Sequence, residues 1–168
     1  MSIRIAIAGV AGRMGQALVR TAGADFTIAG GSERAGSDAL GMAQGGWTVS
    51  DSATRAAGSA DVWIDFTTPA ASLEALDQLK QTGVKAAIIG TTGLSPEQEQ
   101  LVAEHARRIA IVRDRNFSLG VNLMIGLVEQ AAARLKAGWD IEITEGHHRR
   151  KVDAPSGTAL MIGEAAAR

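Results

Sequence analysis

Short apolar runs alternate along the chain with longer stretches in which apolar residues recur every three or four positions. The short runs are typical of buried strands, and the recurrence is typical of amphipathic helices. Residues 2–8 form the first apolar run, and Met14, Ala17, Leu18 and Thr21 then follow at helical spacing. The pattern predicts further strands over residues 26–30, 62–66, 86–90, 109–112 and 139–144, and further helices over residues 68–81, from residue 96 and over residues 119–136.

Two of these helices begin with capping signals. Thr68 stands where an N-cap is expected and is followed by Pro69, and Ser95 and Gln98 have the spacing of a capping box. Residues 35–60, rich in Gly, Ala and Ser, give no clear pattern. Strands separated by helices predict an α/β fold with a mostly parallel, doubly wound sheet.

Composition narrows the class of protein. The chain has 168 residues, enough for one domain, or for one domain and part of another. A net charge of -1 gives no sign of nucleic acid or of an acidic membrane surface as a partner. The absence of cysteine excludes disulfides and fits a reducing compartment. No apolar run approaches the roughly 20 residues that span a bilayer, and no signal-peptide pattern opens the chain, so a cytoplasmic location is expected.

Three residues have expected roles outside any site. Trp63 and Trp139 lie in expected strands and are expected in the core. His105 lies within an expected helix and is interpreted as a surface residue. No set of His, Asp and Glu has the spacing of metal ligands, so no metal site is expected.

Residues 9–15 form a glycine loop that follows the first strand and opens a helix. Its glycines, Gly9, Gly12 and Gly15, have the spacing G-x-x-G-x-x-G, a variant of the dinucleotide fingerprint. Glycines allow a tight turn and let the backbone approach a pyrophosphate at the helix N-terminus. The alternative is an ordinary turn, and the position of the loop between a strand and a helix favours dinucleotide binding.

An acidic residue and a basic residue follow the second expected strand. Glu33 lies 18 residues beyond Gly15, where a carboxylate accepts hydrogen bonds from the adenosine ribose hydroxyls. Arg34 follows directly and is placed to meet a 2′-phosphate. The pair predicts that the site tolerates both NADH and NADPH.

Two further loops follow strands and are expected at the same edge of the sheet. They cover residues 65–69 and 90–93, and ligands bind outside the carboxyl ends of the strands in open α/β sheets. Gly90 and Gly93 would let the backbone approach a nicotinamide ring closely. The alternative is that these loops serve only as helix caps. Residues 116–118, Asn-Phe-Ser, lie just beyond the last strand of this part of the chain.

Residues 145–159 carry the densest group of chemically active side chains. Two histidines, two arginines and a lysine occupy positions 147–151, and Pro155 and Ser156 then lead into an expected helix start. Cationic donors beside the free N–H groups of a helix N-terminus form a site for a small anion such as a carboxylate. Histidine and lysine also supply protons near neutral pH. The alternative is a solvated basic loop.

Together these motifs resemble the 4-hydroxy-tetrahydrodipicolinate reductase (dihydrodipicolinate reductase) family, which acts in the diaminopimelate route of lysine biosynthesis. The most specific segments are His147-His148 and residues 153–159. The resembling segments occur in the family's order and span nearly the whole chain: residues 9–15, 33–34, 65–67, 90–93, 116–122 and 145–159.

The resemblance implies a fold, a reaction and a set of site residues. It implies a Rossmann-type domain over residues 1–117 and the beginning of an α+β substrate-binding and oligomerisation domain over residues 118–168. It implies reduction of 4-hydroxy-tetrahydrodipicolinate, a small dicarboxylate, to tetrahydrodipicolinate by NADH or NADPH, and a homotetramer for the full-length family. His147 would donate a proton with the assistance of Lys151, and the substrate carboxylates would be held by His148, Lys151, Ser156, Gly157 and Thr158. The cofactor would contact Gly9, Gly12, Arg13, Met14, Gly15, Glu33, Arg34, Gly90, Thr91, Thr92, Asn116 and Phe117.

The chain departs from the family pattern in two ways. Asp114 and Arg115 precede the Asn-Phe-Ser segment where the family has small residues or proline, and these charges are expected to flank the nicotinamide site. Family members are also longer, so the chain is expected to lack most of the substrate domain. Two other functions stay open: a nucleotide-binding module without turnover, and another Rossmann dehydrogenase such as a homoserine dehydrogenase relative.

Overall fold

A computed structural model describes residues 2–135, 138–149 and 154–168. It divides into two compact units, Met1–Asp114 and Arg115–Arg168, and each is described by itself. Unit 1 contains β1 (Ile3–Ala8), α1 (Arg13–Thr21), β2 (Phe26–Ser32), β3 (Ala43–Gln44), β4 (Trp47–Ser50), α2 (Ala53–Ala57), β5 (Val62–Asp65), α3 (Pro69–Leu79), β6 (Ala86–Ile89), α4 (Pro96–His105) and β7 (Ala110–Arg113). Unit 2 contains α5 (Leu119–Ala132) and α6 (Gly157–Ala166).

The strands of unit 1 form one sheet in the order β3-β4-β2-β1-β5-β6-β7. All neighbouring strands run parallel except β3 and β4, which form an antiparallel pair at one edge. The strand order reverses direction at β1, with β2 on one side and β5 on the other. This is the doubly wound Rossmann-type sheet that the sequence predicts, and its reversal point is where such folds bind ligands.

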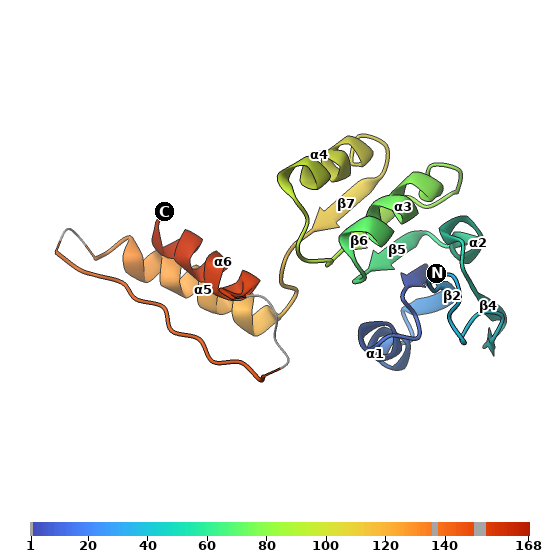
Figure 1. Cartoon of the computed structure of the whole chain (residues 1–168), viewed down its shortest axis with the longest axis horizontal. Coiled ribbons are helices and arrows are strands. Elements are labelled where there is room, and N and C mark those ends of the chain that lie inside the picture. The colour runs from blue at the N-terminus through green and yellow to red at the C-terminus, as the bar shows by residue number, and fades with distance from the viewer. Residues whose placement is uncertain (1, 136–137, 150–153) are drawn as a thin grey trace. The chain divides into compact units, whose positions relative to one another are not determined.

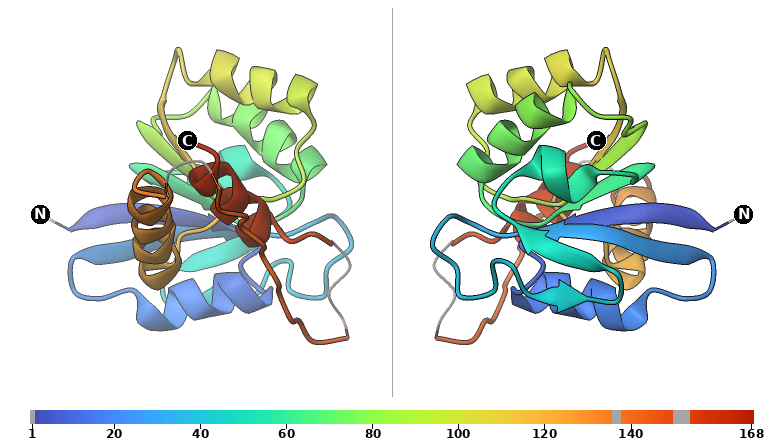
Figure 2. Two further views of the ribbon diagram at one scale, coloured as in Figure 1. Left: turned by 90° about the vertical axis from the view of Figure 1, so that its left-hand side faces the viewer. Right: turned by 90° about the vertical axis from the view of Figure 1, so that its right-hand side faces the viewer.

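Helices cover both faces of the sheet, with α1 on one face and α2, α3 and α4 on the other (Figures 1 and 2). Successive side chains of a strand point to opposite faces. Accordingly Ile5 and Ile7 belong to the core cluster beneath α1, whereas Ala6 and Ala8 belong to the cluster beneath the other three helices. Trp63 is completely buried in the second cluster, as its place in an apolar strand predicts.

The segment without a clear pattern contains β3, β4 and the short helix α2. A Cβ added to Gly30 would lie 1.9 Å from the carbonyl oxygen of Ala56, so α2 packs directly on the backbone of β2. The core residues of α2 are alanines, Ala53, Ala56 and Ala57. Small residues therefore allow this close packing, and the same small residues remove the apolar periodicity from which a helix is predicted.

The expected helix starts of unit 1 are confirmed. Thr68 is the N-cap of α3, and its hydroxyl accepts a hydrogen bond from the Ala71 N–H at 3.4 Å. Ser95 and Gln98 form a reciprocal capping box at the start of α4, with distances of 2.9 and 3.3 Å. These local signals fix where both helices begin.

Three predictions are wrong. Residues 139–144 do not form a strand, since no described strand pairs with them, and Trp139 is 68% exposed instead of buried. A strand and a core position both need a partner from elsewhere in the chain, which a local pattern cannot supply. His105 is only 8% exposed, because α4 ends against α3 and places its imidazole 3.6 Å from Asp77 Oδ1.

Unit 2 consists of α5, an extended segment and α6, and the two helices pack against each other (Figure 1). None of the residues of α5 is buried. Leu119 is 86% exposed and Leu123 is 63% exposed. The described part of unit 2 therefore has an apolar face that no described residue covers.

Candidate functional site

Two neighbouring cavities lie at the carboxyl ends of the central strands of unit 1. One, of about 590 Å³, lies between the glycine loop and Phe66. The other, of about 370 Å³, extends from Gly9 past Glu33 and Arg34 towards α3. Both cavities are lined by Ala8, Gly9, Glu33, Thr67 and Thr68.

The glycine loop has no room for side chains at two of its three glycines. A Cβ added to Gly15 would lie 2.3 Å from the carbonyl oxygen of Gly9, and a Cβ added to Gly9 would lie 2.9 Å from Thr67 Cγ2. Gly9 also has φ of +61°, a conformation that favours glycine. The glycines therefore bring α1 close to β1, with Gly12 as an N-cap that carries no side-chain hydrogen bond.

Glu33 is joined to the same loop. Its Oε1 accepts a hydrogen bond from the Ala11 N–H at 2.9 Å. This hydrogen bond ties the glycine loop to the residue that follows β2. Glu33 also lines both cavities. Arg34 is exposed and lines the 370 Å³ cavity.

A buried polar network joins the loops that follow β5 and β6. Asp65 is completely buried, and its Oδ1 accepts from the Thr67 N–H at 2.9 Å and from the Thr67 hydroxyl at 2.6 Å. The Thr91 hydroxyl lies 3.2 Å from the same Oδ1, 3.0 Å from the Thr67 N–H and 2.8 Å from Ser72 Oγ. The second oxygen of Asp65 has no partner among the described residues. The hydrogen bonds among Asp65, Thr67 and Thr91 join the loop after β5 to the loop after β6. This buried network therefore holds both loops in fixed positions.

This network changes the interpretation of residues 90–93. Thr91 is only 2% exposed, and its hydroxyl is engaged inside unit 1. A Cβ on Gly90 would lie 2.0 Å from the ring of Phe66, so this glycine makes room for an aromatic ring of the protein itself. Thr92 and Gly93 are exposed, and Gly93 has φ of +81°. Among these four residues, Thr92 is the one whose side chain faces solvent.

In unit 2, the segment that precedes α5 is bound to α6. Arg115 forms a bidentate ion pair with Glu164, in which the two guanidinium NH2 groups lie 3.2 and 2.6 Å from the two carboxylate oxygens. This guanidinium lowers the pKa of Glu164 below its ordinary value. Asn116 Nδ2 donates to Thr158 Oγ1 at 2.9 Å. The unusual charge of Arg115 is therefore balanced by a carboxylate of α6.

The start of α6 is bound to the residues around His147. Ser156 is the N-cap, is 2% exposed, and accepts at its hydroxyl from the Ala159 N–H at 3.1 Å. Glu145 accepts the Ser156 N–H at 2.7 Å and also the Ser156 hydroxyl. The same carboxylate lies 3.5 Å from His147 Nδ1. Glu145 thus brings His147 to the N-terminus of a helix.

The predicted site residues fall into two groups. Those of the glycine loop, Glu33 and Arg34 surround the two cavities of unit 1, and His147, Ser156 and Thr158 come together in unit 2. His148 is exposed, and Lys151 lies outside the described residues. Sequence reasoning missed the connecting roles of Asp65 and Glu145. A carboxylate at the end of a buried apolar strand was the available signal for Asp65.

The described residues contain no group of three or more metal-ligating side chains. The helices of the described chain are all too short or too polar to cross a membrane.

A dinucleotide fits the residues that are present. The first turn of α1 has no side-chain cap and no acidic residue, so its N–H groups suit a pyrophosphate. Gly15 carries no side chain and has no room for one, so the backbone at this residue can lie close to a bound pyrophosphate. Glu33 supplies a carboxylate beside the loop, where ribose hydroxyls need an acceptor. The glycine loop, Glu33 and Arg34 would hold the dinucleotide.

The sequence matches two family descriptions. "Dihydrodipicolinate reductase, N-terminus" matches residues 3–117, and "Dihydrodipicolinate reductase, C-terminus" matches residues 120–168. The chain is similar to the 4-hydroxy-tetrahydrodipicolinate reductases of Caulobacter vibrioides and Thiobacillus denitrificans, each at 46% identity. These alignments cover 98% and 100% of this chain but 62% and 66% of the two relatives, so the chain spans less than two thirds of their length.

A solved structure also aligns with nearly the whole of this chain. The dipicolinate-bound dihydrodipicolinate reductase from Paenisporosarcina sp. TG-14 aligns with a TM-score of 0.78 and 31% identity. The alignment covers 99% of this chain and 66% of that one. Because family descriptions, relatives and fold agree along both units, the homoserine dehydrogenase alternative is set aside. The chain belongs to the dihydrodipicolinate reductase family.

Proposed function

We propose that the chain carries the cofactor unit and the first part of the substrate unit of a reductase that uses NADH or NADPH to convert 4-hydroxy-tetrahydrodipicolinate to tetrahydrodipicolinate. The observation that carries this proposal is the link made by Glu145 between His147 and the start of α6. It joins a proton donor to a helix N-terminus that suits a carboxylate. Family membership and the glycine loop of unit 1 support the same reaction.

The reaction requires one hydride and one proton. Its net result replaces the 4-hydroxyl group by hydrogen, with the hydroxyl leaving as water. Elimination of the 4-hydroxyl group together with a proton of the neighbouring carbon gives a carbon–carbon double bond conjugated with the ring imine. A reduced nicotinamide, when bound, would supply hydride to this double bond. The neighbouring carbon then needs a proton, and His147 is the residue that we assign to this step, assisted by Lys151.

The start of α6 is suited to hold a substrate carboxylate. The N–H of Ser156 is taken by Glu145, and that of Ala159 by the Ser156 hydroxyl. The first N–H groups of a helix have no partner within the helix, so those of Gly157 and Thr158 would be the donors for a substrate carboxylate. His148 and Lys151 would add positive charge, which stabilises the negative charge that develops on the substrate.

The cofactor residues have the roles that the geometry of unit 1 allows. The backbone of residues 12–15 would bind the pyrophosphate, and Glu33 the adenosine ribose. Thr91 would act through the network with Asp65, and Thr92 would face the cofactor. The homotetramer implied by the resemblance and the cytoplasmic location expected from the sequence stay predictions.

Parallel binding and turnover measurements on the 168-residue chain test the proposal. NADH and NADPH are titrated by fluorescence, and their oxidation is followed with the cyclic imine substrate. Binding with turnover supports the full proposal. Binding without turnover favours the nucleotide-binding module that the sequence leaves open. If neither cofactor binds, the assignment of unit 1 is wrong.

A further inference from the structure

The 370 Å³ cavity beside Glu33 carries more negative than positive charge. Within the part of the chain that the structure describes, four carboxyl-bearing residues line it, against the single guanidinium of Arg34. The four come from the ends of three different strands and from α3: Glu33, Asp51, Asp65 and Glu74. The acidic character of this cavity therefore comes from several elements that the fold brings together, and a short sequence motif does not reveal it.

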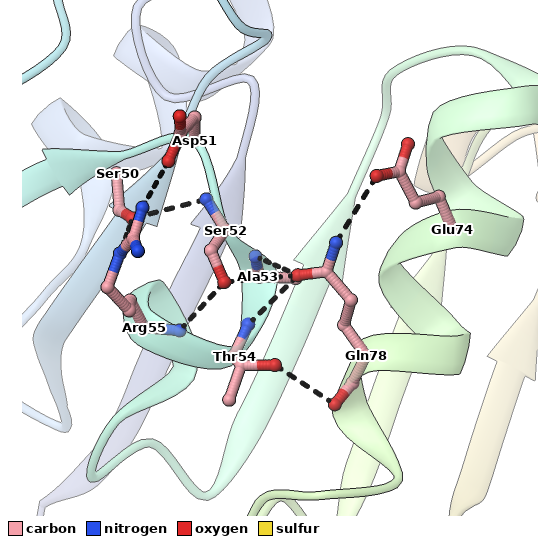
Figure 3. A network of polar contacts seen from close by, with 8 residues as sticks. All are labelled: Ser50, Asp51, Ser52, Ala53, Thr54, Arg55, Glu74 and Gln78. Carbon is pink, nitrogen blue, oxygen red and sulfur yellow. Dashed lines mark hydrogen bonds and ion pairs between the residues drawn. The ribbon is translucent and has the colours of Figure 1, made fainter.

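A hydrogen-bond network holds two of these carboxylates in place (Figure 3). Gln78 Oε1 accepts from the Ala53 N–H at 2.7 Å, and Gln78 Nε2 donates to Glu74 Oε1 at 3.3 Å. At the other end of the network, Arg55 forms an ion pair with Asp51. The side chain of Gln78 thus connects the start of α2 with α3, and Asp51 and Glu74 lie at opposite ends of this connection.

Only one of the four carboxylates is paired with a cation among the described residues. Asp51 is paired with Arg55, whereas the partner of Glu74 is the neutral amide of Gln78. Glu33 accepts from a backbone N–H, and Asp65 accepts from hydroxyl and backbone groups. With Arg34 and Arg55 both counted, the cavity wall keeps a formal excess of negative charge.

We propose that this cavity favours NADH over NADPH, and that Asp51 and Glu74 are specificity-determining residues for this choice. The inference rests on the proposed function, because it takes the cavity as the adenosine side of the dinucleotide site. Free ribose hydroxyls are neutral and donate to carboxylates. A 2′-phosphate carries about −1.5 to −2 charges at neutral pH, which the acidic wall repels.

Equilibrium titration of the chain with NADH and with NADPH, at low ionic strength, tests the inference. We expect NADH to bind at least about tenfold more tightly. Glu74→Gln removes one charge and keeps an oxygen that accepts from Gln78 Nε2. It should tighten NADPH binding about threefold or more and leave NADH binding within about twofold, as loss of one nearby repulsive charge predicts. Glu104→Gln, on the exposed side of α4, is the matched control and should change neither affinity.

Two further measurements separate charge from shape. Asp51→Asn should also tighten NADPH binding selectively, because it removes a carboxylate and leaves Arg55 without its partner. Raising the salt concentration to about 0.5 M should narrow the preference for NADH, since salt screens exposed charges. Thermal unfolding of each variant checks that it folds.

The outcomes distinguish this inference from the function on which it rests. NADPH binding as tight as NADH binding would overturn the inference while the dinucleotide site stands. A preference that neither variant nor salt alters would overturn the roles of Asp51 and Glu74. Failure of both cofactors to bind would overturn the site and the inference together.

Discussion

Glu145 binds both hydrogen-bond donors of Ser156, the N-cap of α6, because its carboxylate accepts the N–H of this residue at 2.7 Å and also its hydroxyl. The carboxylate also lies 3.5 Å from His147 Nδ1. One side chain therefore connects the proposed proton donor with the helix start that would hold a substrate carboxylate. The contacts of Glu145 therefore set how far the proposed proton donor, His147, lies from the helix start at Ser156.

Replacing Glu145 should loosen the start of α6. In Glu145→Ala, the Ser156 N–H loses its acceptor, and the N-cap loses the group that orients its hydroxyl. We expect faster amide hydrogen exchange for Ser156, Ala159 and Leu160, corresponding to a loss of about 1 kcal/mol, the usual value of a helix cap. Glu142→Ala, in the same exposed segment, serves as the control. Unchanged exchange in the first turn of α6 would contradict the contact.

His147 is expected to affect turnover without affecting cofactor affinity. In a protein with a complete substrate unit, His147→Ala should lower kcat by about 10²-fold or more, the usual effect of a lost general acid. Lys151→Ala should impair both substrate binding and turnover. The affinity for NADH should barely change, because the glycine loop lies in the other unit. Near-normal kcat in both variants would return residues 147–151 to the interpretation as a solvated basic loop.

Much of unit 1 is predictable because its signals are local. The capping box at Ser95, the N-cap at Thr68 and the glycine loop each depend on residues within a few positions of one another, and the structure has all three. Alternating apolar strands and periodic helices also predict the parallel sheet correctly. Residues 35–60 show the limit, because the alanines of α2 pack closely on Gly30 of β2 and leave no periodic apolar pattern.

What the sequence did not predict depends on contacts between distant residues. No local pattern indicates that the Thr91 hydroxyl lies 3.2 Å from Asp65 Oδ1, 26 positions away. Trp139 lies in an alternating pattern and is nevertheless exposed, because burial requires a partner surface that a local pattern does not contain. Glu145 lies just before the basic residues 147–151 in the sequence. Its role in holding the start of α6 depends on a contact with Ser156, 11 positions away.

Arg34 is expected to affect the two cofactors differently. Among the described residues that line the acidic cavity it is the single cation, so Arg34→Ala removes the group that offsets repulsion of a 2′-phosphate. We expect NADPH binding to weaken about tenfold and NADH binding to change less than about threefold. Titration with both cofactors measures the difference, with Arg20→Ala at the exposed end of α1 as the control. An equal loss for both cofactors would rule out this role of Arg34.

Gly15 tests the fit of the glycine loop. In Gly15→Ala, the new methyl group would lie 2.3 Å from the carbonyl oxygen of Gly9, so the loop must move away from α1. We expect the free energy of unfolding to fall by about 1–3 kcal/mol, as for other overpacked sites, and dinucleotide binding to weaken about tenfold or more. Calorimetric titration and thermal unfolding measure the two effects. Gly23→Ala is the matched control, since nothing lies within 4 Å of its added Cβ. Equal behaviour of the two variants would show that the loop tolerates a side chain.

The buried His105 should make the stability of unit 1 depend on pH. Burial lowers the pKa of His105 below its ordinary value, and the nearby positive charge of Lys80 lowers it further. Asp77, which lies 3.6 Å from Nε2, and Glu104 act in the opposite direction, and Arg108 acts with Lys80. The net shift means that the unfolded chain, with an imidazole pKa of about 6.5, binds a proton more readily than the folded chain does.

The sign of the effect follows from this difference. The contribution of neutral His105 to stability is fully present above about pH 6.5 and is lost as the pH falls through the lowered pKa of the folded state. Urea unfolding followed by tryptophan fluorescence, to which the buried Trp63 contributes, should therefore show a lower free energy of unfolding at about pH 5.5 than at about pH 7.5. His105→Gln should flatten this dependence, whereas His148→Gln, in the other unit, should leave it unchanged. A slope that persists in His105→Gln would assign the pH dependence to other groups, because His105 is the only histidine in unit 1.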